Sequence, residues 1–340
     1  MHTIAGLIIL YNKTGTWKAL LPYITTMAVT QPGCVSFILL IRFLNVMHEV
    51  IDTISRDSKT LPLQDTLFEK YCIKQVRDTK IIMFLLVMFS FFVHLLIALP
   101  SVFKDYNINI LYWLFKEYYV PPYQEMTLWI SCIAVLIESF VIVYPLIFMG
   151  YFNFHICHRF RCLANYIEHN FDIRSNHDTY AQNSEDQEII YTKLKAAVEY
   201  YLNITRSFSA VAAVQNLSIL LLGTSGLFVS VAVLYFISTD VRPDANYRMF
   251  FVLIEVIVIV SGLSIYGQTI SDESAKLNNV FYKCPWIYWN NKNRRMLIII
   301  LLCTKEFHVS FYNLVNLNHQ IITKGIKWVY SLLAVAVKYK

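Results

Sequence analysis

Long runs of apolar residues alternate with charged segments along this chain. The clearest runs are Ile81–Leu99, Met126–Met149, Phe208–Tyr235, Met249–Tyr266 and Trp328–Val337. A helix needs ~20 apolar residues to cross the hydrocarbon of a bilayer, and the longer runs approach or exceed that length. The pattern therefore predicts an all-α membrane protein with several transmembrane helices.

The remaining segments complete this predicted bundle. An apolar stub at Ile4–Leu10 indicates a first helix that is truncated, and Trp17–Phe43 indicates a second span. The fourth span is expected to continue as a helix through His155–Ile167, and Ile189–Tyr201 is amphipathic. The last helix is expected to be broken, because polar residues separate the apolar stretch before Thr304 from the one after Phe311.

Composition and charge narrow the function classes. Apolar residues make up 56% of the chain and charged residues 15%, against ~25% charged in soluble domains. The net charge of +6 is spread over the connections, so nucleic acid is not expected as a partner. Seven scattered cysteines do not indicate a disulfide framework. No internal repeat is visible, which argues against a transporter built from duplicated halves.

Lysine and arginine predict the orientation. The connections 45–80, 155–206 and 267–295 together carry 17 basic residues, and the opposite set (11–18, 100–124 and 237–248) carries 6. Basic residues favour the cytoplasmic side. We therefore expect the first set to be cytoplasmic, the N-terminus to be intracellular and the C-terminus to be extracellular, which is the reverse of a G-protein-coupled receptor.

The sequence gives little support to an enzyme. It contains no G-x-S-x-G, P-loop or H-E-x-x-H motif, and we expect no catalytic residue and no cofactor. His155, His158 and Cys162 share one helical face and are zinc-ligand types. Because one helix face rarely closes a tetrahedral shell alone, packing is the favoured interpretation of this group, and no metal site is predicted.

Three ionisable residues lie inside predicted spans: His94, Glu138 and Glu255. Such residues are expensive in hydrocarbon and are candidates for function by default. They either help to line a ligand cavity or are satisfied by a neighbouring helix. His94, in the outer half of its span, is the strongest candidate for ligand contact.

The last helix has a polar stripe. Steps of four, three, four, four and three residues connect Gln320, Lys324, Lys327, Ser331, Val335 and Lys338. Such spacing follows one face of a helix, and the other positions are mainly apolar. The stripe indicates either a pore-lining helix or an amphipathic bundle helix. In a pore, Val335 would supply an apolar ring that gates by dewetting.

The C-terminal third resembles an insect odorant receptor, a branch of the family shared with insect gustatory receptors. The resemblance rests on short motifs in a characteristic order: Tyr266-Gly267-Gln268, then Ser274, Tyr282 and Trp286, Arg294-Arg295, Thr304-Lys305, Leu317-Asn318, Thr323-Lys324, Tyr330-Ser331 and Leu333. The segment His155–Leu163 resembles the end of the family's fourth helix.

The resemblance implies a seven-helix subunit of a non-selective cation channel, with four chains around one pore. It divides the chain into a ligand-binding bundle (1–292), with cytoplasmic segments 45–80, 155–206 and 267–292, and a split seventh helix (293–340). In that helix, residues 293–306 would be a cytoplasmic anchor and residues 311–340 would line the pore. The apolar gate would fall on Val335 and Tyr339.

The resemblance also implies partners and a location. A ligand-selective subunit works with a shared odorant co-receptor, binds a small volatile odorant, passes cations and lies in the plasma membrane of a sensory dendrite. At the positions where the co-receptor's ending carries Thr-Tyr and Gln-Leu, this chain has Ser331-Leu332 and Lys338-Tyr339. These departures favour the ligand-selective subunit. A gustatory-type channel that acts as a homomer is the alternative.

The family's odorant pocket lies in the outer half of the bundle. By outward position and helical face, we expect the pocket to be lined by Tyr23, Met27, Phe91, His94, Leu95, Trp129, Ile133, Leu136, Phe228 and Phe251. Aromatic rings would supply shape and dispersion, and His94 or Tyr23 would fix a polar atom of the odorant.

Overall fold

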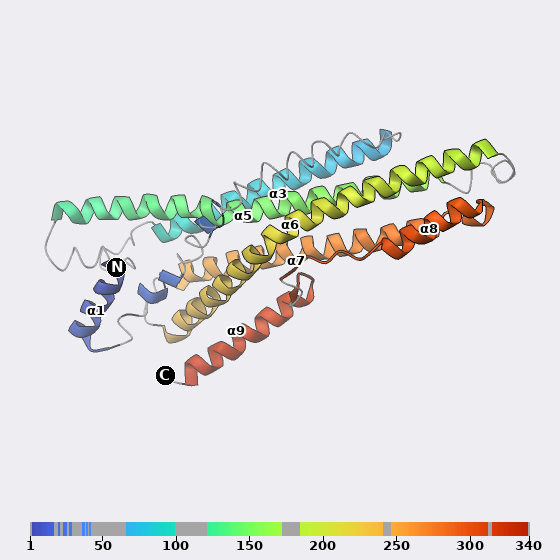
Figure 1. Cartoon of the computed structure of the whole chain (residues 1–340). Coiled ribbons are helices and arrows are strands. Elements are labelled where there is room, and N and C mark those ends of the chain that lie inside the picture. The colour runs from blue at the N-terminus through green and yellow to red at the C-terminus, as the bar shows by residue number, and fades with distance from the viewer. Residues whose placement is uncertain are drawn as a thin grey trace.

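The computed structural model is an elongated bundle of long helices (Figure 1). It describes residues 2–16, 66–98, 121–171, 184–240, 246–311 and 315–338, together with isolated positions between 20 and 41. In order, the elements are α1 (His2–Thr14), α3 (Thr66–Ala98), α5 (Pro121–Asn170), α6 (Ser184–Thr239), α7 (Asn246–Tyr282), the 3-10 turn η2 (Trp286–Tyr288), α8 (Asn291–Cys303), β1 (Ser310–Phe311), β2 (Val315–Asn316) and α9 (Gln320–Lys338). The predicted all-α class is confirmed.

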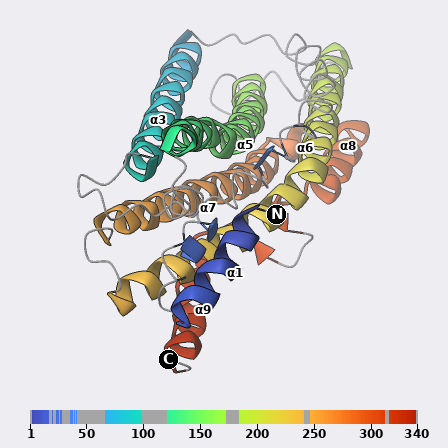
Figure 2. The same ribbon diagram turned by 90° about the vertical axis from the view of Figure 1, so that its left-hand side faces the viewer.

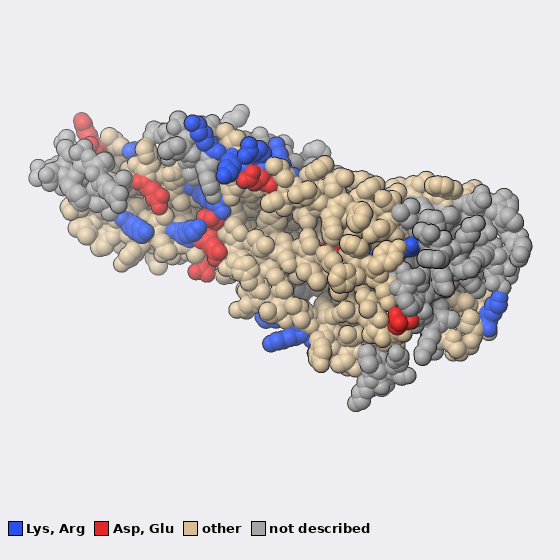
Figure 3. All heavy atoms as spheres, turned by 180° about the vertical axis from the view of Figure 1, so that it is seen from behind, with Lys and Arg blue, Asp and Glu red and all other residues tan. Residues whose placement is uncertain are grey.

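Four of the described helices are long and apolar enough to cross a membrane. The candidate spans are Ile73–Ile97 in α3, Ser139–Asn170 in α5, and the helices α6 and α7. Figure 3 agrees with this assignment, because charged side chains gather near the end that holds α8 and the middle of that face is almost free of charge. A surface of this kind suits hydrocarbon around the middle of the bundle.

Two of the spans belong to helices that extend well beyond the apolar run. The amphipathic stretch Ile189–Tyr201 and the apolar run that follows it form the single helix α6 of 56 residues. The fourth span continues without a break to Asn170 in α5, as expected, although Pro145 inside this helix cannot donate a backbone hydrogen bond. The predicted second span and the first half of the connection 45–80 fall mostly outside the described residues.

The break in the final helix is confirmed, but its second half begins later than predicted. Residues Ser310–Phe311 and Val315–Asn316 form a short antiparallel pair of strands, and α9 starts only at Gln320. Leu317 is buried between the strands and α9, and its N–H donates to the carbonyl of Val309. From there α9 diverges from the other long helices (Figures 1 and 2).

The largest hydrophobic core lies in the half of the bundle that holds α8. There α5, α6, α7 and α8 bury a continuous cluster that includes Phe152, Phe160, Leu194, Phe281 and Leu297. The other half holds a smaller cluster around Val93, Phe236 and Met249, where the end of α3 meets α6 and the start of α7. The packing of the bundle is thus unequal along its length.

Candidate ligand-binding site

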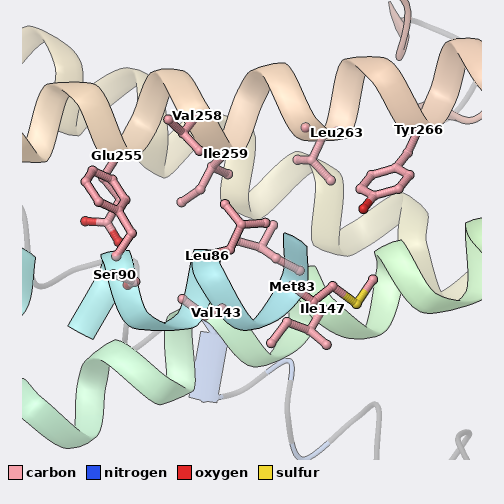
Figure 4. A pocket seen from close by; sticks show the side chains of 13 residues that line it. Met83, Leu86, Ser90, Val143, Ile147, Glu255, Val258, Ile259, Leu263 and Tyr266 are labelled. Carbon is pink, nitrogen blue, oxygen red and sulfur yellow. The ribbon is translucent and has the colours of Figure 1, made fainter. Parts of the chain in front are cut away.

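A small cavity lies where α3, α5 and α7 meet. Its volume is about 50 Å³, and Figure 4 shows its wall of aliphatic side chains with Tyr266 at one end and Ser90 and Glu255 at the other. The sequence builds this wall from α7 positions four residues apart, Glu255, Ile259 and Leu263, which share one helical face. The cavity is too small for more than a few non-hydrogen atoms.

A larger cavity adjoins it and shares part of its wall on α5 and α7. It has a volume of about 140 Å³ and is lined by α5, α6 and α7, with His94 from α3, Leu317 from the segment before α9 and Ile321 from the first turn of α9. On α6, the glycines at positions 223 and 226 line the cavity without a side chain and so leave space in it. This volume is close to that of an engineered apolar cavity, ~150 Å³, that takes up benzene in another protein.

The two cavities share part of their walls and one carboxyl group. Leu146 of α5 and Glu255, Ile259 and Leu263 of α7 line both. Glu255 is 7% exposed and His94 is 4% exposed, so both are buried. Apart from the phenol of Tyr266, Glu255 and His94 are the ionisable side chains among the residues that line the two cavities, and the rest of the lining is mainly apolar.

The geometry of this pair is loose. His94 Nδ1 lies 2.9 Å from the carbonyl oxygen of Ser90, one turn back on α3, and 3.9 Å from Glu255 Oε1. A carbonyl can only accept, so Nδ1 donates its proton to Ser90. The carboxyl oxygen is beyond hydrogen-bond distance, and Oε1 has no hydrogen-bond partner among the residues that the structure describes.

Among the residues predicted to bind the ligand, His94 is the one that lines a described cavity. Leu95, Leu136 and Met27 are half-buried, Phe91 packs on Phe140 with ring centroids 5.7 Å apart, and Phe251 packs on Phe92 at 5.9 Å. Tyr23 is buried in a separate cluster with Leu10 and Leu20. None of these residues is among those that line the two described cavities.

Three predicted residues lie on the surface of the isolated chain. Trp129 is 68% exposed, Ile133 55% and Phe228 66%. The physical reason is that a span that is apolar on every side gives no sign of which face meets lipid and which meets the core. The sequence argument did not select most of the wall residues on α6 and α7, although it singled out Glu255, which lies on the face of α7 that lines both cavities. The side chain of Glu138 lies outside the described residues.

The helix that lines both cavities also contacts the start of the last helix. Ser264 Oγ donates to the carbonyl of Asn318 at 2.8 Å, and Gly267 packs directly against the backbone of Leu317. A side chain at Gly267 would collide with the Leu317 carbonyl. Because α7 is continuous from Asn246 to Tyr282, one helix connects the cavities to this junction.

The residues of the polar stripe lie on α9 away from the bundle. Gln320, Lys324, Lys327, Ser331 and Val335 are all exposed, and Ser331 Oγ donates back to the carbonyl of Lys327. The apolar residues Ile326, Trp328 and Leu332 of the same helix are exposed as well. The side chain of Lys338 and all of Tyr339 lie outside the described residues. A helix exposed on both its polar and its apolar sides suits contact with further subunits.

The histidine and cysteine group on α5 is part of the packed half of the bundle. Cys162 Sγ lies 3.5 Å from His158 Nε2, and the ring of His155 stacks on Tyr151. In the described part of the chain, no three histidine, cysteine or acidic side chains are grouped as metal ligands.

Comparisons with known proteins agree on one family. Residues 21–323 match the family model described as 7tm odorant receptor. The fold is similar to that of the olfactory receptor OR5 of the insect Machilis hrabei, with a TM-score of 0.79 and 14% identity over 99% of this chain and 86% of that one. The structure of the same receptor in complex with eugenol matches to the same degree. Comparison with curated protein sequences gives no match.

Proposed function

The chain belongs to the 7tm odorant receptor family, and from this premise we propose that it is the odorant-binding subunit of an odorant-gated, non-selective cation channel. The family is one of receptors, and the chain is a multi-pass membrane protein. The observation that carries the proposal is the shared use of α7, which lines both cavities and also contacts the junction with α9.

In this proposal, the odorant occupies the larger cavity. The OR5 receptor of similar fold has been solved with eugenol, a molecule with a single aromatic ring. The 140 Å³ cavity suits a ligand of about that class, with small shifts of its aliphatic walls. A ligand of ten to fifteen non-hydrogen atoms at ~0.3–0.6 kcal/mol each binds with roughly micromolar affinity.

Gating then requires coupling from the cavity to the pore. We propose that the ligand displaces α7 slightly and that the contacts of Ser264 and Gly267 pass this displacement to the segment before α9. Ser331, Val335 and the positions up to Tyr339 would line the pore, and Val335 would move away from its axis. Because the binding energy is small, the closed state is a few kcal/mol more stable than the open one.

Assembly with other subunits follows from exposed apolar faces at two places. Ile298, Ile299 and Leu302 lie exposed on α8, and Trp328 and Leu332 lie exposed on α9. Exposed apolar groups of this size mark interaction surfaces when lipid does not cover them. We propose that α8 packs against neighbouring subunits in the cytoplasm and that α9 packs against them around the pore, with a shared odorant co-receptor as the partner.

Recording odour-evoked current from cells that express the chain with and without an odorant co-receptor tests the function. We expect current only with the co-receptor. Current from the chain alone would favour the gustatory-type homomer. If neither expression gives current although surface delivery is verified by labelling, the channel assignment is wrong. Labelling of a tag after Lys340 on intact cells tests the proposed extracellular C-terminus.

A further inference from the structure

Polar atoms at the larger cavity have unused capacity to accept hydrogen bonds, and the Ser90 hydroxyl, which lies beside the Glu255 carboxyl, belongs to the smaller cavity. Glu255 Oε1 is buried without a hydrogen-bond partner in the described part of the chain. The Nδ1 proton of His94 already goes to the Ser90 carbonyl, and in the neutral imidazole this leaves Nε2 as an acceptor. Ser225 Oγ, also in the wall, donates to the carbonyl of Leu222 in its own helix.

An unpaired polar atom in such a place is costly. A buried acceptor without a partner loses its hydration and gains nothing in return, so buried polar groups in folded proteins nearly always have partners. Glu255 has a place for one, since its side chain lines the cavity. A ligand that donates a hydrogen bond there removes the cost, and an apolar ligand of the same size leaves it in place.

We infer that the ligand of this cavity is a small alcohol or phenol whose hydroxyl group donates to Glu255 Oε1. The inference deepens the proposed function by naming the chemical class that the same site selects. An ionised carboxyl accepts hydrogen bonds at both oxygens, and a neutral carboxyl still accepts at its carbonyl oxygen, so the carboxyl can take the hydroxyl proton in both charge states. A hydroxyl also enters an apolar cavity at lower cost than a charged ammonium group. The aliphatic walls of α5, α6 and α7 surround the remainder of the ligand.

Three probes of nearly equal size separate this inference from plain apolar binding. Benzyl alcohol carries the hydroxyl, ethylbenzene replaces that hydroxyl with a methyl group, and benzyl methyl ether keeps an oxygen that can only accept. Thermal unfolding of the purified full chain in lipid nanodiscs reports binding without any need for gating. We expect benzyl alcohol to stabilise the chain at a concentration at least tenfold lower than either of the other probes.

Variants of Glu255 locate the contact. Glu255→Leu removes the acceptor and should abolish the tenfold preference, and Glu255→Gln keeps a carbonyl acceptor and should retain it. The control is Ser139→Ala, because Ser139 is buried in α5, bonds to the carbonyl of Leu136 and lines neither cavity. This variant should bind all three probes as the unaltered chain does.

Equal stabilisation by benzyl alcohol and ethylbenzene would overturn the inference, as would a preference that persists in Glu255→Leu or an absence of stabilisation by all three probes. If Glu255→Leu does not fold, the three probes on the unaltered chain still decide. Failure of the channel proposal is separate from this outcome. If the chain binds benzyl alcohol through Glu255 but passes no odour-evoked current with a co-receptor, the inference is supported and the channel proposal is contradicted.

Discussion

The half of the bundle near α8 and the half that holds the cavities differ in the hydrogen bonds that connect their helices. Near α8, polar side chains pair with one another. Gln187 of α6 donates to the Tyr288 carbonyl, and its Oε1 accepts from the Asn290 N–H and from Asn293 Nδ2. Asn290 in turn caps α8 by accepting from the backbone of Asn293. These bonds tie the start of α6 to the start of α8.

The cavity half has few such bonds between helices. His94 bonds within its own helix, and the carboxyl of Glu255 is 3.9 Å away from it. The side chains around them are mainly aliphatic and leave two voids. Aliphatic contacts are not directional, so they let helices shift at lower cost than a network of fixed hydrogen bonds. We therefore expect the half near α8 to be the more rigid one and the cavity half to yield more easily, as the proposed assembly and ligand binding require.

Removing a charge from the rigid half should have the largest effect on stability. Arg161 of α5 contacts Glu273 of α7 through Nη2 at 2.8 Å and Nε at 2.9 Å, and both side chains are mostly buried. Glu273→Gln leaves the guanidinium without its counter-charge, which should lower the free energy of unfolding by about 3 kcal/mol. Urea unfolding in detergent measures this change in the free energy of unfolding. The control is the exposed pair Lys195–Glu199, where Glu199→Gln should change the free energy of unfolding by about 0.5 kcal/mol or less. Equal losses in the two variants would contradict the account.

A substitution at the contact between α7 and the segment before α9 should have the next largest effect. Gly267→Ala places a methyl group against the Leu317 carbonyl, which cannot move aside like a side-chain end. We expect a loss of about 2 kcal/mol in the free energy of unfolding and a reduced maximal odour-evoked current. Gly262→Ala, five residues earlier on α7, has no atom within 4 Å of the new methyl group and should not be destabilising. A tolerated Gly267→Ala would remove the proposed coupling.

Filling the larger cavity should change ligand response more than stability. Val256 lines that cavity, and its neighbour Ile257 is exposed and lines neither cavity. Val256→Phe should raise the odorant concentration for half-maximal current at least tenfold, equivalent to about 1.4 kcal/mol. Ile257→Phe should leave it unchanged. Concentration–response recording with a co-receptor compares the two variants, and equal responses would place the ligand elsewhere.

The smallest expected effect is a difference in thiol reactivity between the buried Cys284 and the exposed Cys303. Burial raises the pKa of the Cys284 thiol to about 12, so at pH 8 almost none of it is the reactive thiolate. Cys303 at the end of α8 is exposed. In chains that retain one cysteine, maleimide should label Cys303 rapidly and Cys284 slowly. Co-assembly should slow labelling of Cys303 if α8 packs against other subunits; rapid labelling of Cys284 would contradict its burial.

Much of the fold could be predicted from the sequence because lipid imposes a length and a composition. The apolar run Ile81–Leu99 lies in α3 except for its last residue, and Met249–Tyr266 lies within α7. The break before α9 was predicted from polar residues between two apolar stretches. Its boundary was not, because the strand pair around Phe311 and the burial of Leu317 depend on contacts with distant parts of the chain.

The site was less predictable. His94 was identified because an ionisable residue in a span is rare, and the same rule marked Glu255. The aliphatic wall could not be chosen, because Ile259 in the wall and Ile257 on the surface belong to the same apolar run and differ only in direction. The role of Val335 in a pore depends on other subunits and stays a prediction.

The most direct test of the account is a structure of the receptor bound to an agonist identified by recording. The account predicts ligand density in the larger cavity, between α6 and α7, with a polar atom of the ligand within hydrogen-bond distance of Glu255. Density outside both cavities that α7 lines, with the larger cavity still empty, would contradict it.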